Sequence, residues 1–144
     1  MQVQNPHYQD VIRWAFANAP FVIDLGIIPT VIKPGHVQSE MPIIQKHLQH
    51  NGFIHGGVQA TIADYCGTAA AGTLIAADEI VLTAEFKINF LRAANGDMLR
   101  CTSTVLKPGA TLIVVESEVY AVNKEESKLI SKAIITVSVL KMQG

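Results

Sequence analysis

The spacing of apolar residues predicts helices and a β-hairpin in the first half of the chain. Residues 6–18 show a loosely helical spacing, with Pro6 near the start. Residues 22–32 and 36–44 are apolar, β-branched runs separated by the turn-like sequence "KPG", which is typical of two paired strands. Residues 57–75 predict one long helix, because apolar side chains recur there at helical spacing.

After the long helix the apolar period falls to two residues. Between residues 80 and 90, one set of alternating positions is apolar: Leu82, Ala84, Phe86, Ile88 and Phe90. This alternation predicts a half-buried strand with Thr83 on the opposite, more polar face. Three more apolar runs predict strands joined by turns: residues 98–106, 110–122 and 128–140. The order predicts an α+β fold, with one antiparallel sheet packed against one long helix.

The predicted long helix has two different faces. Val58, Ile62 and Cys66 form a stripe of larger apolar side chains, whereas Asp64 is surrounded by small residues. These small neighbours are Gly57, Ala60, Thr61, Gly67, Thr68 and Ala71. A carboxylate on such a face is costly unless it is paired or faces a water-filled site. Asp64 is therefore either a structural hydrogen-bond hub or a catalytic group.

Composition narrows the class of protein. The 144 residues suit a single domain, and 11 Lys and Arg against 12 Asp and Glu give a net charge of −1. This balance gives no electrostatic footprint for nucleic acid or an anionic membrane, so the expected partners are small molecules or copies of the chain. Cys66 and Cys101 fit no disulfide or metal pattern, which predicts free buried thiols and a cytoplasmic location. The beginning of the chain lacks the pattern of a secretory signal, and Asp64 argues against a transmembrane reading of residues 56–77.

Several short motifs together resemble one known family. They are "HGG" at 55–57, an acid nine residues after His55, "VLTAEFKINFLRAANGD" at 81–97 and "LKPGATL" at 106–112. With this set the chain resembles hotdog-fold acyl-CoA thioesterases of the phenylacetic-acid-degradation type. The resemblance implies an antiparallel sheet wrapped around one long central helix in a single domain, residues 1–144. An N-terminal helical segment would occupy residues 1–20, and the hotdog core would occupy residues 21–140.

The chemistry of thioester hydrolysis assigns candidate roles to these motifs. The reaction needs a base or nucleophile and hydrogen-bond donors for the developing oxyanion. Gly56 and Gly57 open the long helix, where free N–H groups and the helix dipole favour negative charge. The resemblance implies that the N–H of Gly56 polarises the thioester carbonyl. It also implies that Asp64 attacks the thioester or activates water, and the sequence favours neither route.

Three more residues complete the expected catalytic site. Gln49 stands where relatives carry an amide side chain that places the substrate or the water, and the neighbouring Asn51 is the alternative for this role. His55 would hydrogen-bond near the carbonyl or cap the loop. Thr83 matches a hydroxyl that, in relatives, bonds the catalytic water or acid, and its alternative is an ordinary strand threonine.

Further residues are expected to contact coenzyme A. Lys107, Gly109 and Thr111 match a turn that approaches the nucleotide in relatives, and Arg92 is a second phosphate partner; the alternative is a solvated hairpin. Coenzyme A would be part of the substrate, so no separate cofactor is expected. His47 and His50 have no cysteine or acid ligand beside them, which disfavours a metal site.

The resemblance also implies an assembly and leaves alternatives open. The site would be made across a homodimer interface, with the glycine-bearing loop of one subunit facing the acid of its partner. Dimers would commonly pair into tetramers. A non-catalytic acyl-CoA sensor and an enoyl-CoA hydratase or dehydratase on the same fold are the alternative functions. The identity of the acyl group stays open.

Overall fold

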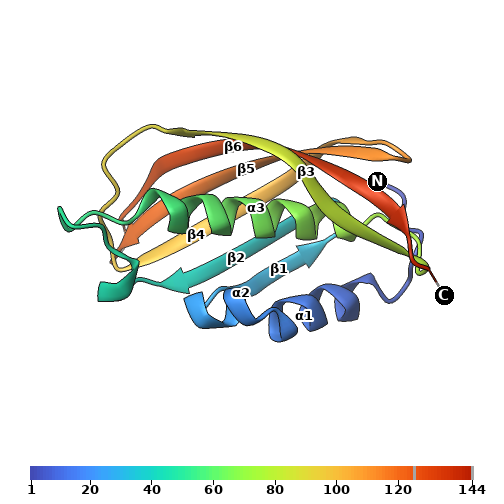
Figure 1. Ribbon diagram of the computed structural model, residues 1–144, viewed down its shortest axis with the longest axis horizontal. Helices are drawn as coiled ribbons and strands as arrows, with labels where there is room; N and C mark the ends of the chain where they lie inside the picture. The colour runs from blue at the N-terminus through green and yellow to red at the C-terminus, as the bar shows by residue number, and fades with distance from the viewer. Residues whose placement is uncertain (125, 144) are drawn as a thin grey trace.

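The computed structural model describes residues 1–124 and 126–143, and it has an α+β architecture in which a curved sheet wraps around one helix (Figure 1). The helices are α1 (Tyr8–Asn18), α2 (Pro20–Leu25), the short 3₁₀ helix η1 (Gln45–His47) and α3 (Gly56–Gly72). The strands are β1 (Ile28–Lys33), β2 (His36–Pro42), β3 (Glu79–Phe90), β4 (Met98–Pro108), β5 (Leu112–Asn123) and β6 (Glu126–Lys141). The predicted hotdog fold is confirmed. None of the described helices is long and apolar enough to cross a membrane.

The six strands form one antiparallel sheet in the order β1-β2-β4-β5-β6-β3. The chain leaves β2, which lies next to the edge strand β1, passes through α3, and returns at the opposite edge of the sheet as β3, beside β6. Strand β3 therefore lies at one end of the sheet and pairs with a single neighbour within the described residues. It is 12 residues long and mostly exposed, so it presents a long free edge.

The predicted alternation along β3 is wrong at its centre, because a β-bulge changes its phase. Pairing with β6 shifts register between Thr83 and Glu85. Thr83 pairs with Val137 and Phe86 pairs with Ile135, and both of these β6 residues are fully buried under α3. Directly paired residues share a face of the sheet, so Thr83 and Phe86 both face the helix. A bulge adds one residue, and Thr83 thereby leaves the predicted outer face and approaches α3.

The N-terminal region differs from the prediction because residues 22–32 divide into a helix and a strand. Pro20 starts α2, where a missing N–H costs nothing. Gly26 ends it in the left-handed conformation, at φ 85°, and its N–H bonds to the carbonyls of Val22 and Ile23. The helical segment therefore extends to residue 25, beyond the expected boundary at residue 20.

Helix α1 is fastened to α3 by aromatic contacts. Phe16 is buried, and its ring meets the ring of Tyr65 edge to face, with 4.9 Å between centroids. The hydroxyl of Tyr65 donates to the carbonyl of Ala15 at 2.8 Å. Two elements distant in sequence thus form one continuous surface beside the sheet.

Helix α3 lies very close to the sheet at its midpoint. Ser117 of β5 donates a hydrogen bond to the carbonyl oxygen of Ala63 at 2.8 Å, and Ser103 of β4 lies 2.6 Å from Ser117. A Cβ atom on Gly67 would lie 2.7 Å from Cδ1 of Ile135, a contact that only glycine avoids. These contacts fix the rotation of the helix about its own axis.

The two cysteines lie in the same buried layer. Cys66 on α3 and Cys101 on β4 are fully buried free thiols, as predicted. Burial raises the pKa of the Cys101 thiol, which keeps it protonated. Both cysteines act here as small apolar side chains of the core.

Candidate active site

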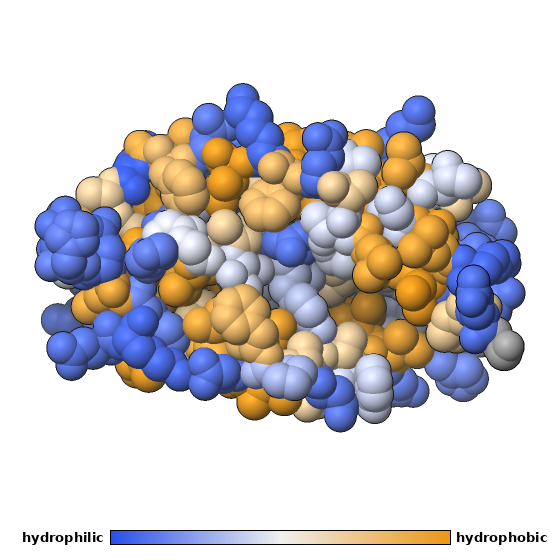
Figure 2. Space-filling view, in the orientation of Figure 1, coloured by the Kyte–Doolittle hydropathy of each residue, from blue (hydrophilic) through white to orange (hydrophobic). Residues whose placement is uncertain are grey.

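Asp64 is a half-buried carboxylate held by two threonine hydroxyls. Its Oδ1 accepts a 2.7 Å hydrogen bond from Oγ1 of Thr83, so that Asp64 on α3 is tied to Thr83 on β3. Thr68, one turn further along α3, places its hydroxyl 3.5 Å from the same oxygen and 3.0 Å from the hydroxyl of Thr83. Among the residues that the structure describes, none donates a hydrogen bond to the second carboxylate oxygen, Oδ2, which is therefore available to another partner. Figure 2 shows a small hydrophilic area over α3 between apolar patches on this face of the molecule.

The N-terminus of α3 presents a free backbone donor. His55 caps the helix, and its Nδ1 accepts a 2.8 Å hydrogen bond from the N–H of Gly57. Because Nδ1 accepts, the imidazole proton resides on Nε2, which is exposed as a donor. Within the described residues, the N–H of Gly56 has no acceptor, as expected for the first turn of a helix. The ring of Phe90 covers this glycine, 3.3 Å from where a Cβ would stand.

A tight loop before α3 places Gln49. The N–H of Gln49 donates to the carbonyl of Phe53 at 2.8 Å, and its own carbonyl accepts from the N–H of Gly52 at 2.9 Å. The Gln49 side chain is half-buried, whereas that of Asn51 is exposed. Gln49 is therefore the more buried of the two amides that the sequence left open.

Two buried polar residues support this loop, a role that the sequence did not predict; His47 was considered there only as a metal ligand. His47 accepts the N–H of Ile44 on Nδ1 at 3.0 Å, and its carbonyl accepts the N–H of His55 at 2.9 Å. Gln59 donates from its side chain to the carbonyl of Ile54 at 3.1 Å. The sequence signal for Gln59 was a polar amide within a helix made mostly of small and apolar residues. Burial lowers the pKa of His47, and the positive charge of Lys46 lowers it further.

The two halves of the predicted site lie far apart in one chain. Gly56 and Asp64 are eight residues apart on α3, which corresponds to about 12 Å along the axis. A reacting carbonyl must lie about 3 Å from its donor and close to the attacking group. One chain therefore brings together Asp64 with Thr83, and Gly56 with His55, but it does not bring these pairs together.

The predicted coenzyme A residues are also divided between two ends of the molecule. Arg92 follows β3, near the Gly56 end of α3, and its Nη1 donates to the carbonyl of Leu129 at 2.7 Å. The hairpin with Lys107, Gly109 and Thr111 joins β4 to β5 at the other end, where Leu112 pairs with Ser138. Leu129 and Ser138 are nine residues apart on β6, about 30 Å along a strand.

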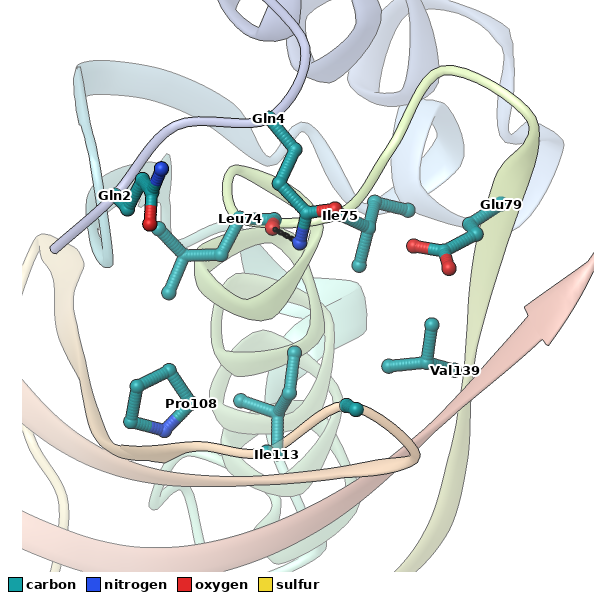
Figure 3. Close-up of a pocket in the computed structure, with 10 residues that line it drawn as sticks. Gln2, Gln4, Leu74, Ile75, Glu79, Pro108, Ile113 and Val139 are labelled. Atoms are coloured by element: carbon teal, nitrogen blue, oxygen red, sulfur yellow. Dashed lines mark hydrogen bonds between the residues drawn. The ribbon is translucent and has the colours of Figure 1, made fainter.

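An apolar groove opens beside Asp64. It has a volume of about 270 Å³ and lies between α1, α3 and the start of β3. Thr68, whose hydroxyl approaches Asp64, is one of its lining residues. A second hollow of about 480 Å³ lies beyond it, between the C-terminal end of α3 and the β4–β5 hairpin (Figure 3).

Comparison with known proteins identifies the family. The family model described as the thioesterase superfamily matches residues 51–128. A crystal structure of a thioesterase family protein from Silicibacter pomeroyi is 34% identical, with a TM-score of 0.91 over 93% of this chain and 98% of the other. The 1,4-dihydroxy-2-naphthoyl-CoA hydrolase of Listeria monocytogenes is 26% identical over 81% of this chain and 93% of its own. The PaaI protein from the phenylacetic acid degradation operon of E. coli, 20% identical, shares the fold with a TM-score of 0.82 over 98% of this chain and 97% of its own. The chain has the hotdog fold, its span from the loop before α3 into the sheet matches the family model, and it belongs to the thioesterase superfamily.

Proposed function

We propose that the protein hydrolyses acyl-CoA thioesters, converting an acyl-CoA and water into a free carboxylic acid and coenzyme A. The observation that carries this proposal is the Asp64 carboxylate, fixed by Thr83 on a helix face otherwise made of small residues. Membership of the thioesterase superfamily and the hydrolase name of the Listeria relative support the reaction class. That relative is also named for an acyl-CoA substrate, which supports coenzyme A as the carrier.

Asp64 supplies the base or the nucleophile. Its Oδ1 is held by Thr83, so Oδ2 is the oxygen directed at the reacting centre. As a base, Oδ2 removes a proton from water while that water attacks the thioester carbon. As a nucleophile, Oδ2 attacks the carbon itself, thiolate leaves, and water then cleaves the resulting anhydride. In both routes the C–S bond breaks, and the departing sulfur ends as the thiol of coenzyme A.

Gly56 supplies the oxyanion donor from a second copy of the chain. Its unpaired N–H lies at the positive end of α3, the usual place for a developing negative charge. The separation of about 12 Å between Gly56 and Asp64 along α3 is too long for one carbonyl, so two chains are needed. The free edge of β3, which carries Thr83, offers a surface on which a second chain can complete the site. His55 and Gln49 then position the substrate from the same loop as Gly56.

Coenzyme A is held by residues from both chains. Arg92 lies near Gly56 of its own chain, whereas the hairpin with Lys107, Gly109 and Thr111 lies at the opposite end. The separation of about 30 Å along β6 prevents one chain from placing both on a single nucleotide. An antiparallel pair of chains brings the two ends together, which accounts for both sets of residues.

A complementation experiment tests the shared site. Asp64→Asn is nearly isosteric, and we expect it to lower kcat by at least about a hundredfold. Gly56→Pro removes the N–H but suits the first position of a helix, and His55 already has the extended conformation that precedes proline, with ψ 136°. Gly56→Ala is its matched control, because it adds carbon near Phe90 while it keeps the N–H.

Mixing equal amounts of the Asp64→Asn and Gly56→Pro chains should restore activity. About half of the dimers will be mixed, and each will hold one intact site, so roughly a quarter of wild-type activity is expected. Mass spectrometry must show that mixed dimers formed. If they form without recovery, the two groups do not act across chains. If the wild type releases no thiol from a panel of acyl-CoAs, or hydrates enoyl-CoA instead, the hydrolase assignment is wrong.

A further inference from the structure

The groove beside Asp64 is built as a pocket for an apolar group. Its walls come from three separate elements, with Trp14 on α1, Ala69 on α3 and Ile80 on β3 among them. Trp14 and Ile80 are 67% and 40% exposed, and both line this one groove. Apolar surface gathered in a concave site usually marks a ligand groove.

One end of the groove lies at Thr68, one turn of α3 beyond Asp64, and the groove follows α3 toward its C-terminus. Thr68 and Gly72 lie one turn apart on α3, and Ile75 lies beyond the end of that helix, so the groove extends from the hydroxyl that approaches Asp64 past the C-terminus of α3. Ile12 of α1 packs closely against Gly72 of α3 in this groove, since a Cβ on Gly72 would lie 3.0 Å from Cδ1 of Ile12. An acyl group attached to a carbonyl at Asp64 would therefore enter the groove directly.

The far end of the groove carries negative charge. Glu79 lines both the groove and the larger hollow, and Figure 3 shows it with Ile75 at the edge of that hollow. Its Oε2 accepts the N–H of Ala76 at 2.9 Å, which fixes the carboxylate in place. Lys141 lies 3.5 Å from Glu79 but also pairs with Asp78, so two acids share one exposed lysine.

We propose that the groove between α1, α3 and β3 is the acyl pocket, with Trp14 as its wall and Glu79 as its end, and that it selects uncharged acyl groups of medium length or with one aromatic ring. A cavity of about 150 Å³ holds a benzene molecule, and the groove has about 270 Å³. A second carboxylate at the end of the acyl chain would meet Glu79 and be rejected. This inference rests on the proposed acyl-CoA hydrolysis and adds its substrate class.

Two variants on α1 and one control test the pocket through ratios of kcat/KM for different acyl-CoAs. Trp14→Ala removes the wall, and Ala15→Leu fills the groove from the same helix. Both should lower kcat/KM for octanoyl-CoA and benzoyl-CoA by about tenfold or more, since even one methylene in an apolar pocket changes specificity by that much. Acetyl-CoA is too short to use the groove, so its kcat/KM should change less than about twofold. Phe21→Ala is the matched control, because Phe21 is an exposed aromatic residue on α2 outside the groove.

Glu79→Gln tests the charged end, because glutamine keeps an oxygen for the N–H of Ala76. The ratio of kcat/KM for adipyl-CoA to that for hexanoyl-CoA, two chains of equal length, should rise by about tenfold. An unchanged ratio would overturn the role of Glu79.

The outcomes separate this inference from the reaction itself. If the wild type hydrolyses acyl-CoAs and Asp64→Asn does not, but Trp14→Ala and Ala15→Leu leave the octanoyl-to-acetyl ratio unchanged, the acyl pocket lies elsewhere and the hydrolase assignment stands. If Trp14→Ala instead dissociates the assembly in sedimentation, the groove is a contact between chains, and the proposal is wrong. If the wild type hydrolyses no acyl-CoA, both the proposed function and the proposed role of the groove are wrong.

Discussion

Removing the hydroxyl of Thr83 should cost turnover without weakening substrate binding. The change is Thr83→Val, which keeps the shape of the side chain and deletes the 2.7 Å hydrogen bond to Oδ1 of Asp64. A hydrogen bond to a charged group contributes about 1.5–3 kcal/mol. If that energy orients the carboxylate in the transition state, kcat should fall by about 10- to 150-fold while KM stays within about twofold.

Two control variants separate orientation from damage to the strand. Thr83→Ser keeps the hydroxyl and should retain most of the wild-type kcat. Thr68→Val removes a hydroxyl that lies 3.5 Å from Asp64, a distance at the limit of a hydrogen bond, so its loss should be less than about fivefold. Because the two hydroxyls lie 3.0 Å apart, the double variant should lose less than the product of the single losses.

The assay is steady-state release of thiol from an acyl-CoA that the wild type hydrolyses, with thermal unfolding measured on each variant. Wild-type kcat in Thr83→Val would refute the positioning role. An equal loss in Thr83→Ser and Thr83→Val would show that β3 packing, and not the hydroxyl, supports the site.

Three other expectations follow from the same structure. Burial lowers the pKa of His47 below the value of about 6.5 in an unfolded chain, so the unfolded state binds more protons in acid and the contribution of His47 to stability, present above about pH 6.5, is lost as the pH falls. Urea unfolding at pH 7.5 and 5.5 should show a smaller difference in His47→Asn than in the wild type; an equal difference would contradict this. Gly109→Ala places a Cβ against the carbonyl oxygen of Leu112 and should lower the free energy of unfolding by more than about 1 kcal/mol, whereas Ala110→Gly in the same turn should cost less; equal values would argue against the clash. Sedimentation should show a homodimer or homotetramer that buries more than about 1,200 Å² per pair, and activity per chain should fall when dilution dissociates it; an active monomer would exclude a shared site.

The sequence predicted what depends on local periodicity. The 3.6-residue spacing located α3 almost to its ends, and the alternating runs located the strands. The phase of β3 could not be read, because a bulge is set by pairing with β6 and leaves no sign in the alternation of β3 itself. Helix α2 was missed for a related reason, since its few apolar residues look the same in a helix and in a strand.

The candidate site was predictable as a set of residues and not as an arrangement. The glycine at the helix start and the lone acid on the small-residue face were visible in the sequence. Their separation of about 12 Å follows from helix geometry, but the partnership of Asp64 with Thr83 depends on β3 reaching the far edge of the sheet and on its bulge. The supporting roles of His47 and Gln59 were not predicted, because they are hydrogen bonds to the backbone of a loop, which no pattern of residue types encodes.

The hydrogen bond from Ser117 to the carbonyl of Ala63 limits how far the next residue on α3, Asp64, can move. Asp64 is attached to a helix that cannot roll or slide without breaking that bond and without driving Gly67 against Ile135. The carboxylate is therefore a fixed reference point, and a substrate must adjust to it. Any yielding needed for acyl groups of different shape has to come from elements outside this clamp, namely α1, the loop before α3 and the start of β3. Mutations that broaden or narrow the substrate range should therefore accumulate in those segments, whereas substitutions of Ser117 or Gly67 should lower activity toward every acyl group.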